Sequence, residues 1–218
     1  MPKRMPRFDL HLLAVARTAT AIVEAGELAH VSSDNTVRKK WATTRLEALY
    51  ELAYLRIFAA WESCLEGIFY RSLCGYASSA GREVIVGGAY YSSVAAAEAA
   101  VLPPGFSYTL WHSPTKVIRR CQQFIQSGTG GGPDLQRTVL ASNVTRLEYL
   151  SYARHRIVHD QADAKVKFNN ATRSLVGRTY LASRPGKFLR DWDASGTARR
   201  RWLETLIQEL TGLARQMV

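Results

Sequence analysis

Cysteine is scarce in this chain of 218 residues, and its three copies fit no cysteine framework. Cys64, Cys74 and Cys121 are odd in number, and none of them belongs to a Cys-x-x-Cys pair. This pattern argues against a disulfide scaffold and against a thiolate zinc site. Cys64 and Cys121 fall within helical patterns, where they are expected to be small core residues. We therefore expect a reducing compartment.

Long apolar runs are also missing. No window reaches the ~18 apolar residues that a transmembrane helix needs. The N-terminus is basic, but the apolar stretch at residues 10–16 is short, contains His11 and runs into Arg17. It therefore does not read as the apolar part of a secretory signal. We expect a soluble, cytoplasmic protein with no membrane partner.

Acidic residues are few, with 18 Asp and Glu against 29 Lys and Arg, which gives a net charge of +11. Residues 151–201 hold twelve Lys and Arg but only four Asp and Glu, and so carry eight of the eleven net charges. A concentrated positive field attracts polyanions, of which nucleic acid is the commonest in a cell. A membrane surface is the weaker alternative, and a basic surface that only aids solubility is the simplest one.

Apolar residues are plentiful, at 47% of the chain, and many recur at helical spacing. The expected helices cover residues 9–30, 36–76, 93–101, 114–126, 143–159, 162–175 and 196–218. A short strand is expected at residues 84–86, and a small β-hairpin at residues 180–189 turns at Arg184-Pro185-Gly186-Lys187. These patterns predict an all-α fold, a four- to five-helix bundle with loop insertions. We expect one domain over residues 1–218, with an insertion at about 77–113 and a basic C-terminal extension at about 161–218.

Arg154 lies in the middle of the apolar side of the expected helix at residues 143–159. A guanidinium group there is costly unless it is paired or faces a wet cleft. One solution is an ion pair with a core carboxylate such as Glu62 or Glu66. The other is a second copy of the helix, packed so that a polar cleft remains between the two. The second solution predicts a homodimer whose twofold axis passes close to this helix.

His159 is the nearest candidate for proton transfer, because an ordinary imidazole titrates near neutral pH. It lies five residues after Arg154, about 140° around an ideal helix, so the two side chains cannot meet on a straight helix. They could converge if the helix bends or ends near Ile157, or if two helices face each other in a dimer.

Residues 152–160 resemble the R-x-x-x-x-H motif of the HEPN ribonucleases, with Arg154 and His159 as its two ends. That family favours a small polar residue or a histidine directly after the arginine, and His155 satisfies this. The aromatic-rich segment at residues 58–69 is similar to the second helix of several HEPN branches. The compact RiboL-PSP or MAE type resembles this chain most.

The resemblance covers residues 36–160 and implies a HEPN-like bundle that works as a homodimer and needs no metal or cofactor. It implies an endoribonuclease in which the 2′-hydroxyl of RNA attacks the adjacent phosphate and leaves a 2′,3′-cyclic phosphate. In this scheme His159 moves protons, Arg154 stabilises the charged phosphorane and His155 orients its neighbour. The role stays open between a toxin, an antiphage defence effector and a processing enzyme. We expect one of the first two, with a cognate antitoxin or regulatory protein as its partner.

The chain departs from the family at one position. Toxins paired with nucleotidyltransferase antitoxins often carry a tyrosine two residues after the motif histidine, where it can be modified, and Gln161 stands there. That form of control is not expected. The basic residues expected to bind RNA are Arg156, Arg184, Lys187, Arg190, Arg199 and Arg200, in part because aromatic residues interleave with them.

Two other functions remain open. His155 and His159 are four residues apart and could form half of a zinc site, but a metalloprotease needs Glu where Arg156 stands. A non-catalytic HEPN-like module that binds nucleic acid or a partner protein is the stronger alternative. Family members that have lost catalysis usually lack the motif arginine or histidine, and both are present here.

Overall fold

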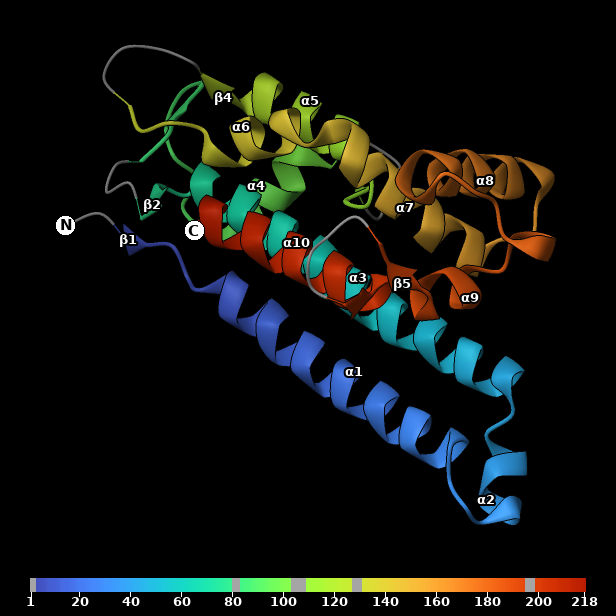
Figure 1. The fold of residues 1–218 in the computed structure, drawn as a ribbon. Coiled ribbons are helices and arrows are strands. Elements are labelled where there is room, and N and C mark those ends of the chain that lie inside the picture. Colours follow the sequence, from blue (N-terminus) through green and yellow to red (C-terminus); the bar gives the residue numbers. More distant parts are fainter. Residues whose placement is uncertain (1–2, 80–82, 103–108, 127–130, 195–198) are drawn as a thin grey trace. The chain divides into compact units, whose positions relative to one another are not determined.

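The computed structural model describes residues 3–79, 83–102, 109–126, 131–194 and 199–218, and these are predominantly helical (Figure 1). The α-helices in these ranges are α1 (Phe8–His30), α2 (Asn35–Lys40), α3 (Thr43–Leu73), α4 (Val94–Val101), α5 (Pro114–Phe124), α6 (Leu135–Ser142), α7 (Val144–Val158), α8 (Ala162–Val176), α9 (Pro185–Arg190) and α10 (Trp202–Met217). The predicted all-α class is confirmed, although the described residues form more helices than the four or five expected.

The strands are short, and they pair two by two within the described residues. The parallel pair is β1 (Lys3–Arg4) with β2 (Tyr76–Ala77), and the antiparallel pairs are β3 (Ile85–Val86) with β4 (Ile125–Gln126) and β5 (Trp192–Asp193) with β6 (Arg200–Arg201). These ladders tie loops together and form no extended sheet. No helix among the described residues is long and apolar enough to cross a membrane.

The chain forms two compact units, and several long helices contribute residues to both. The first unit contains residues 1–12, 61–147 and 211–218, and the second contains residues 13–60 and 148–210. Every candidate site residue of the sequence analysis belongs to the second unit.

The first unit is built around aromatic side chains of α3. Phe69 and Tyr70 each pack against the indole of Trp111, with ring centroids 5.6 Å apart in both pairs. The Trp111 Nε1 group donates a hydrogen bond to Glu66 at 2.9 Å. Gln136 of α6 donates to the Leu65 carbonyl of α3 at 2.7 Å, so this buried amide finds a partner.

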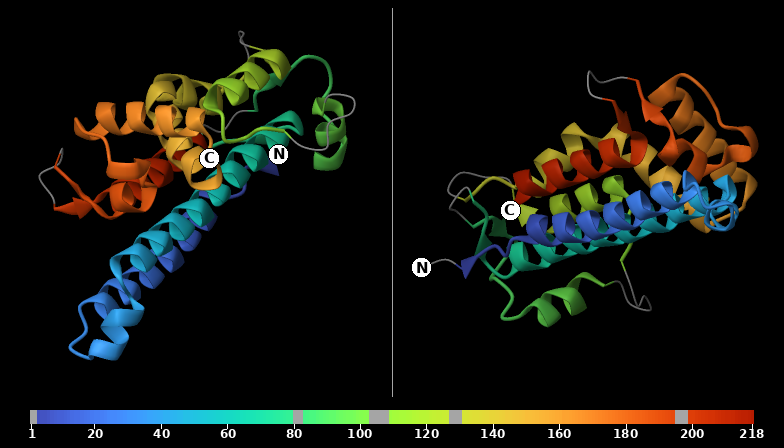
Figure 2. Two further views of the ribbon diagram at one scale, coloured as in Figure 1. Left: turned by 90° about the vertical axis from the view of Figure 1, so that its right-hand side faces the viewer. Right: turned by 60° about the horizontal axis from the view of Figure 1, so that its bottom comes forward.

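The second unit begins with parts of α1 and α3 that run side by side in opposite directions, joined through α2 (Figure 1, Figure 2). Gly26 lets the two helices approach, because a Cβ atom there would lie 2.6 Å from a methyl group of Leu49. The Tyr50 hydroxyl donates to Glu27 of α1 at 2.8 Å, and the Tyr54 hydroxyl donates to the Leu150 carbonyl of α7 at 3.0 Å. These bonds fasten α1 and α7 to the same long helix.

The C-terminal part of the second unit packs around Phe188 of α9. Its ring stacks on buried Trp202 at 5.3 Å between centroids and meets Phe168 of α8 edge-on at 6.0 Å. Gly186 packs against the backbone of α3, where an added Cβ would lie 2.3 Å from the Glu47 carbonyl oxygen. The short helix α9 is therefore a fixed part of the core.

Two expectations about this fold are wrong. Residues 180–189 form a 3₁₀ turn, η1 (Leu181–Ser183), and helix α9 instead of a β-hairpin. Pro185 begins α9, because proline fits the first position of a helix as well as a turn. The helix expected over residues 36–76 is interrupted between Lys40 and Thr43. Helix α6, for which no expectation was stated, precedes α7.

The expected start of the last helix is also displaced. Gly196 and Thr197, expected to open it, lie outside the described residues. Helix α10 begins at Trp202, and Arg200 and Arg201 lie in β6 just before it. Arg200 and Arg201 therefore precede the last helix, although the expected range of 196–218 included them.

Candidate active site

The two motif histidines meet at the C-terminal end of α7. The helix ends at Val158, but the His159 amide still donates to the His155 carbonyl at 2.9 Å, which continues the helical spacing by one residue. The imidazole rings consequently stand 4.6 Å apart between centroids, tilted by 49°. Both side chains are partly exposed. The two imidazole rings are therefore neighbours at a position that solvent can reach.

The surroundings of His155 favour its neutral form. Partial burial is the largest cause that lowers its pKa below 6.5, followed by the proximity of His159 and the positive charge of Lys167. Arg154 lowers the pKa further, whereas the carboxylate of Asp163 opposes the shift. At neutral pH the His155 ring therefore offers one N–H donor and one acceptor nitrogen.

Arg154 lies half-buried in α7, next to a helix side on which Leu147, Leu150 and Ala153 are buried. It takes part in an interaction within the chain, and its charge reaches His155. The mixed character predicted for this side of the helix is therefore present: buried aliphatic side chains lie beside a partly accessible guanidinium group.

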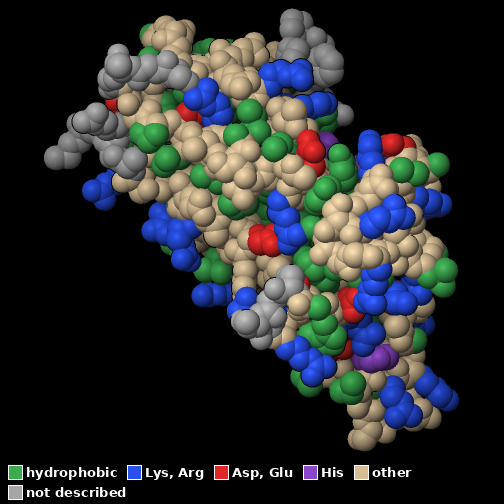
Figure 3. Space-filling view, turned by 45° about the horizontal axis from the view of Figure 1, so that its top comes forward, with side chains coloured by type: hydrophobic (Ala, Val, Ile, Leu, Met, Phe, Trp, Pro, Cys, Tyr) green, Lys and Arg blue, Asp and Glu red, His purple; other side chains and the backbone are tan. Residues whose placement is uncertain are grey.

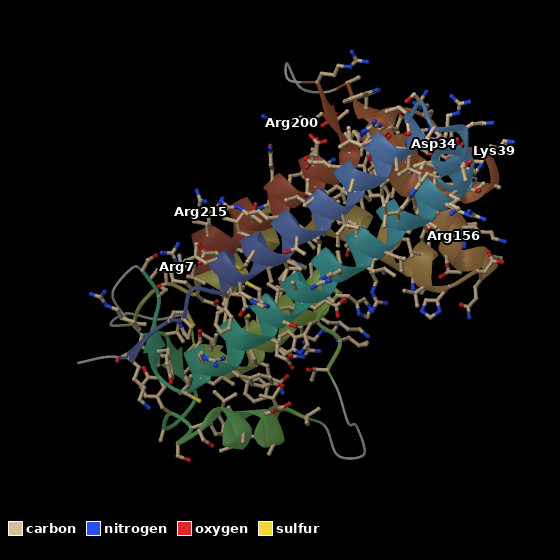
Figure 4. The ribbon with its side chains drawn as sticks, turned by 90° about the horizontal axis from the view of Figure 1, so that it is seen from below. Arg7, Asp34, Lys39, Arg156, Arg200 and Arg215 are labelled. Atoms are coloured by element: carbon tan, nitrogen blue, oxygen red, sulfur yellow. The ribbon has the colours of Figure 1, made fainter. Side chains whose placement is uncertain are left out.

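Arg156 was expected to contact RNA. In the structure it lies near the end of α7 (Figure 4), where its side chain bonds to neighbouring residues of the same chain. Its Nε group donates to the Ser183 carbonyl and its Nη1 group to the His159 carbonyl, both at 3.1 Å. The same guanidinium forms an ion pair with Asp160 at 3.0 Å, and its side chain is only 14% exposed. Arg156 therefore holds His159 and η1 together.

The turn that receives Arg156 has an unusual backbone. Ala182 and Ser183 have φ values of 56° and 49°, in the left-handed region that non-glycine residues rarely adopt. The Ser183 hydroxyl donates to Asn169 of α8 at 2.9 Å, while its carbonyl accepts from Arg156. Bonds on both sides of Ser183 hold the turn in this conformation.

Two other arginines that were expected to bind RNA form ion pairs with carboxylates. Arg184 forms an ion pair with the buried Glu47. Arg190 donates to both carboxylate oxygens of Glu27, at 2.9 and 3.2 Å. These pairs fix α9 to α3 and α1, so both guanidinium groups serve the fold whatever else they contact.

The remaining expected contacts are more accessible. Lys187 is exposed on α9. The guanidinium carbon of Arg199 lies 4.5 Å from the ring centroid of Trp192, a cation–π contact. Arg200 donates to Gln208 at 2.7 Å and is exposed (Figure 4).

Sequence reasoning missed the lysine side chains that lie near the histidine pair. Lys165 forms an ion pair with Asp160 at 3.1 Å, and Lys167 forms one with Asp163 at 2.8 Å. Both lysines belong to the basic stretch at residues 151–201, but the sequence did not show that α8 brings them close to Asp160 and His155. The described residues contain no group of three or more His, Cys, Asp or Glu side chains arranged to hold a metal ion.

Comparisons with protein-family models, with curated proteins and with solved structures found no match to this chain. The candidate site consequently rests on its own geometry: a histidine pair at a helix end, a half-buried arginine beside it, and a second arginine that fixes the turn.

Proposed function

We propose that this protein is a metal-independent endoribonuclease of the HEPN kind, with Arg154, His155 and His159 as its active groups. The observation that carries the proposal is the pair of partly exposed imidazoles 4.6 Å apart at the end of α7, with the Arg154 charge close enough to shift one of them. Lys and Arg side chains also outnumber Asp and Glu side chains on the face drawn in Figure 3, which suits an RNA substrate.

The proposed reaction uses the substrate's own nucleophile. The 2′-hydroxyl oxygen attacks the adjacent phosphorus while His159 accepts its proton, and the bond from phosphorus to the 5′-oxygen then breaks. The 5′-oxygen takes a proton back from the imidazolium. The products are a 2′,3′-cyclic phosphate and a 5′-hydroxyl end, and one imidazole can serve both transfers because it can accept a proton and give it back.

The other two groups support this step. Arg154 is the group that would stabilise the charged phosphorane, because a planar guanidinium matches the geometry of phosphate oxygens. His155, whose pKa is lowered, remains neutral and can hold the ring of His159 or the substrate by a hydrogen bond. Its proposed role is orientation.

The proposal includes a homodimer, in which the helices equivalent to α7 face each other across a shared groove. Support comes from the mixed surface of α7, where Val158 is 48% exposed close to the partly accessible Arg154. A toxin or an antiphage effector is the role we propose for such an enzyme, and an antitoxin or regulatory protein would then restrain it.

The test is incubation of the purified protein with RNA in the presence of EDTA. We expect cleavage of RNA but not of a 2′-deoxy oligonucleotide of the same sequence, because the deoxy strand lacks the nucleophile. Retained RNA binding without any cleavage would favour the non-catalytic module instead. Strict dependence on a divalent ion would contradict the proposed mechanism.

A further inference from the structure

A surface pocket of about 490 Å³ lies in the second unit, between the start of α3, η1, α9 and the ladder β5–β6. Its volume falls in the range of small-molecule sites. The cationic residues among its described lining are Arg178, Lys187, Arg190 and Arg201, and Trp192 contributes an aromatic ring. Neither histidine of the candidate active site is part of this described lining.

The carboxylates of the pocket offset only part of this charge. Glu47 and Asp191 line it, and each already forms an ion pair, with Arg184 and with Arg178 respectively. Asp191 also accepts a hydrogen bond from the Tyr180 hydroxyl at 2.6 Å. The described lining therefore carries four cationic and two anionic side chains, an excess of positive charge.

Two arginines of the lining are held in place by a carboxylate outside it. Arg190 and Arg201 both contact Glu27, at 2.9 and 3.1 Å, and Arg201 also donates to the Arg190 carbonyl at 2.6 Å. Both side chains are 22% exposed. Each guanidinium therefore has a fixed position with N–H donors left over, which is the preorganisation that tight anion binding requires.

Lys187 differs from these arginines. It is exposed on α9, lines the pocket, and makes no ion pair with any residue in the described ranges. A flexible ammonium group beside two fixed guanidinium groups is a suitable set of donors for a phosphate.

The aromatic wall of the pocket is also accessible. Trp192 is 43% exposed, and the guanidinium carbons of Arg199 and Arg201 lie 4.5 and 4.6 Å from its ring centroid. A planar base can pack against the exposed part of this indole and the planar guanidinium groups beside it, while neighbouring cations bind phosphate.

We propose that this pocket binds a nucleotide, with the phosphate at Lys187, Arg190 and Arg201 and the base against Trp192. A free nucleoside monophosphate and the phosphorylated end of an RNA strand present this same group. The proposal does not depend on the ribonuclease reaction, because it concerns binding at residues outside the candidate active site.

Titration calorimetry of the full chain with AMP, adenosine and inorganic phosphate tests the pocket. We expect AMP to bind more tightly than either adenosine or phosphate, since only AMP offers both base and phosphate. Lys187→Ala should weaken AMP binding about tenfold, as expected for one charge-assisted contact. Lys187→Arg should retain most of the affinity, and Lys39→Ala, which removes an exposed lysine of α2, should change nothing.

A second titration separates the two sources of the phosphate. His159→Ala protein, chosen so that RNA stays intact, is titrated with a short RNA bearing either a 5′-phosphate or a 5′-hydroxyl. A preference for the phosphorylated strand that Lys187→Ala removes would identify an RNA end as a ligand, and a preference for AMP alone would identify the free nucleotide. Equal AMP affinity for wild type and Lys187→Ala, or no AMP binding, would overturn the proposal.

Discussion

His155 and His159 differ in their surroundings although their rings are neighbours. Burial and nearby positive charges lower the pKa of His155 below 6.5, so its NMR titration midpoint should lie below that value. Lys167→Gln should raise the midpoint, because it removes a positive neighbour, and Asp163→Asn should lower it further. Shifts in the same direction for both variants would contradict this electrostatic account.

The lowered pKa of His155 also has a consequence for stability. Because the unfolded chain binds this proton more readily, the free energy of unfolding should fall as the pH drops below about 6.5 and level off below the folded-state pKa. His155→Asn should lose this part of the pH dependence. Urea denaturation at a series of pH values compares the two proteins, and identical pH profiles would contradict the assignment.

Arg156 is the residue for which structure and sequence disagree most. Arg156→Ala should lower the free energy of unfolding by about 1–3 kcal/mol, because it leaves charge-assisted bonds to two carbonyl groups unmade. Arg156→Lys should restore little of this stability, since a lysine ammonium group cannot reproduce the planar arrangement of donors with which the guanidinium reaches both carbonyl groups. Chemical denaturation measures both variants.

Arg17→Ala, at an exposed position of α1, is the matched control for Arg156 and should be close to neutral. If Arg156→Ala keeps full stability but loses RNA affinity, Arg156 is a substrate contact, as the sequence suggested, and the bracing role is wrong.

At the scale of elements, the close packing of α9 on α3 gives a sharp prediction. Gly186→Ala should destabilise the protein by about 1–3 kcal/mol, because the added methyl group meets backbone atoms of Glu47 that cannot move aside. Gly212→Ala in α10 has nothing within 4 Å of its new Cβ and should stabilise by about 0.5–1 kcal/mol. Thermal denaturation of the two variants checks the opposite signs, and a neutral Gly186→Ala would contradict the packing.

Helices with clear end signals could be predicted from the sequence. Ser93 accepts a hydrogen bond from Ala96 at the start of α4, and the boundaries of α1 and α8 lie within one residue of those expected. The region around Pro185 could not be predicted, because proline followed by glycine is compatible with a turn and with a helix start. Only packing against α3 decides between them.

For the candidate site, the sequence supplied the residues but not their partners. The four-residue spacing of His155 and His159 predicts neighbouring rings wherever helical geometry continues. The bond from Arg156 to the carbonyl of Ser183 could not be predicted, because every residue has a backbone carbonyl and the sequence does not show which one accepts the bond. The pairing of Arg184 and Arg190 with distant carboxylates depends likewise on the tertiary fold.

At the scale of the whole molecule, the proposed twofold groove predicts a dimer in solution. Light scattering should give twice the chain mass of 24.3 kDa. If arginine and histidine from different copies cooperate, mixing inactive Arg154→Gln with inactive His159→Ala protein should restore part of the activity through mixed dimers. A fully active monomer at assay concentration would contradict the shared groove.

The most direct test of the central proposal is mass spectrometry of RNA fragments produced in EDTA by wild type, His159→Ala and His11→Ala. His11 is an exposed histidine of α1 and controls for the loss of any imidazole. We expect wild type and His11→Ala to leave 2′,3′-cyclic phosphate ends at equal rates, and His159→Ala to leave none. Unchanged cleavage by His159→Ala, or fragments that end in a 3′-hydroxyl, would contradict the account.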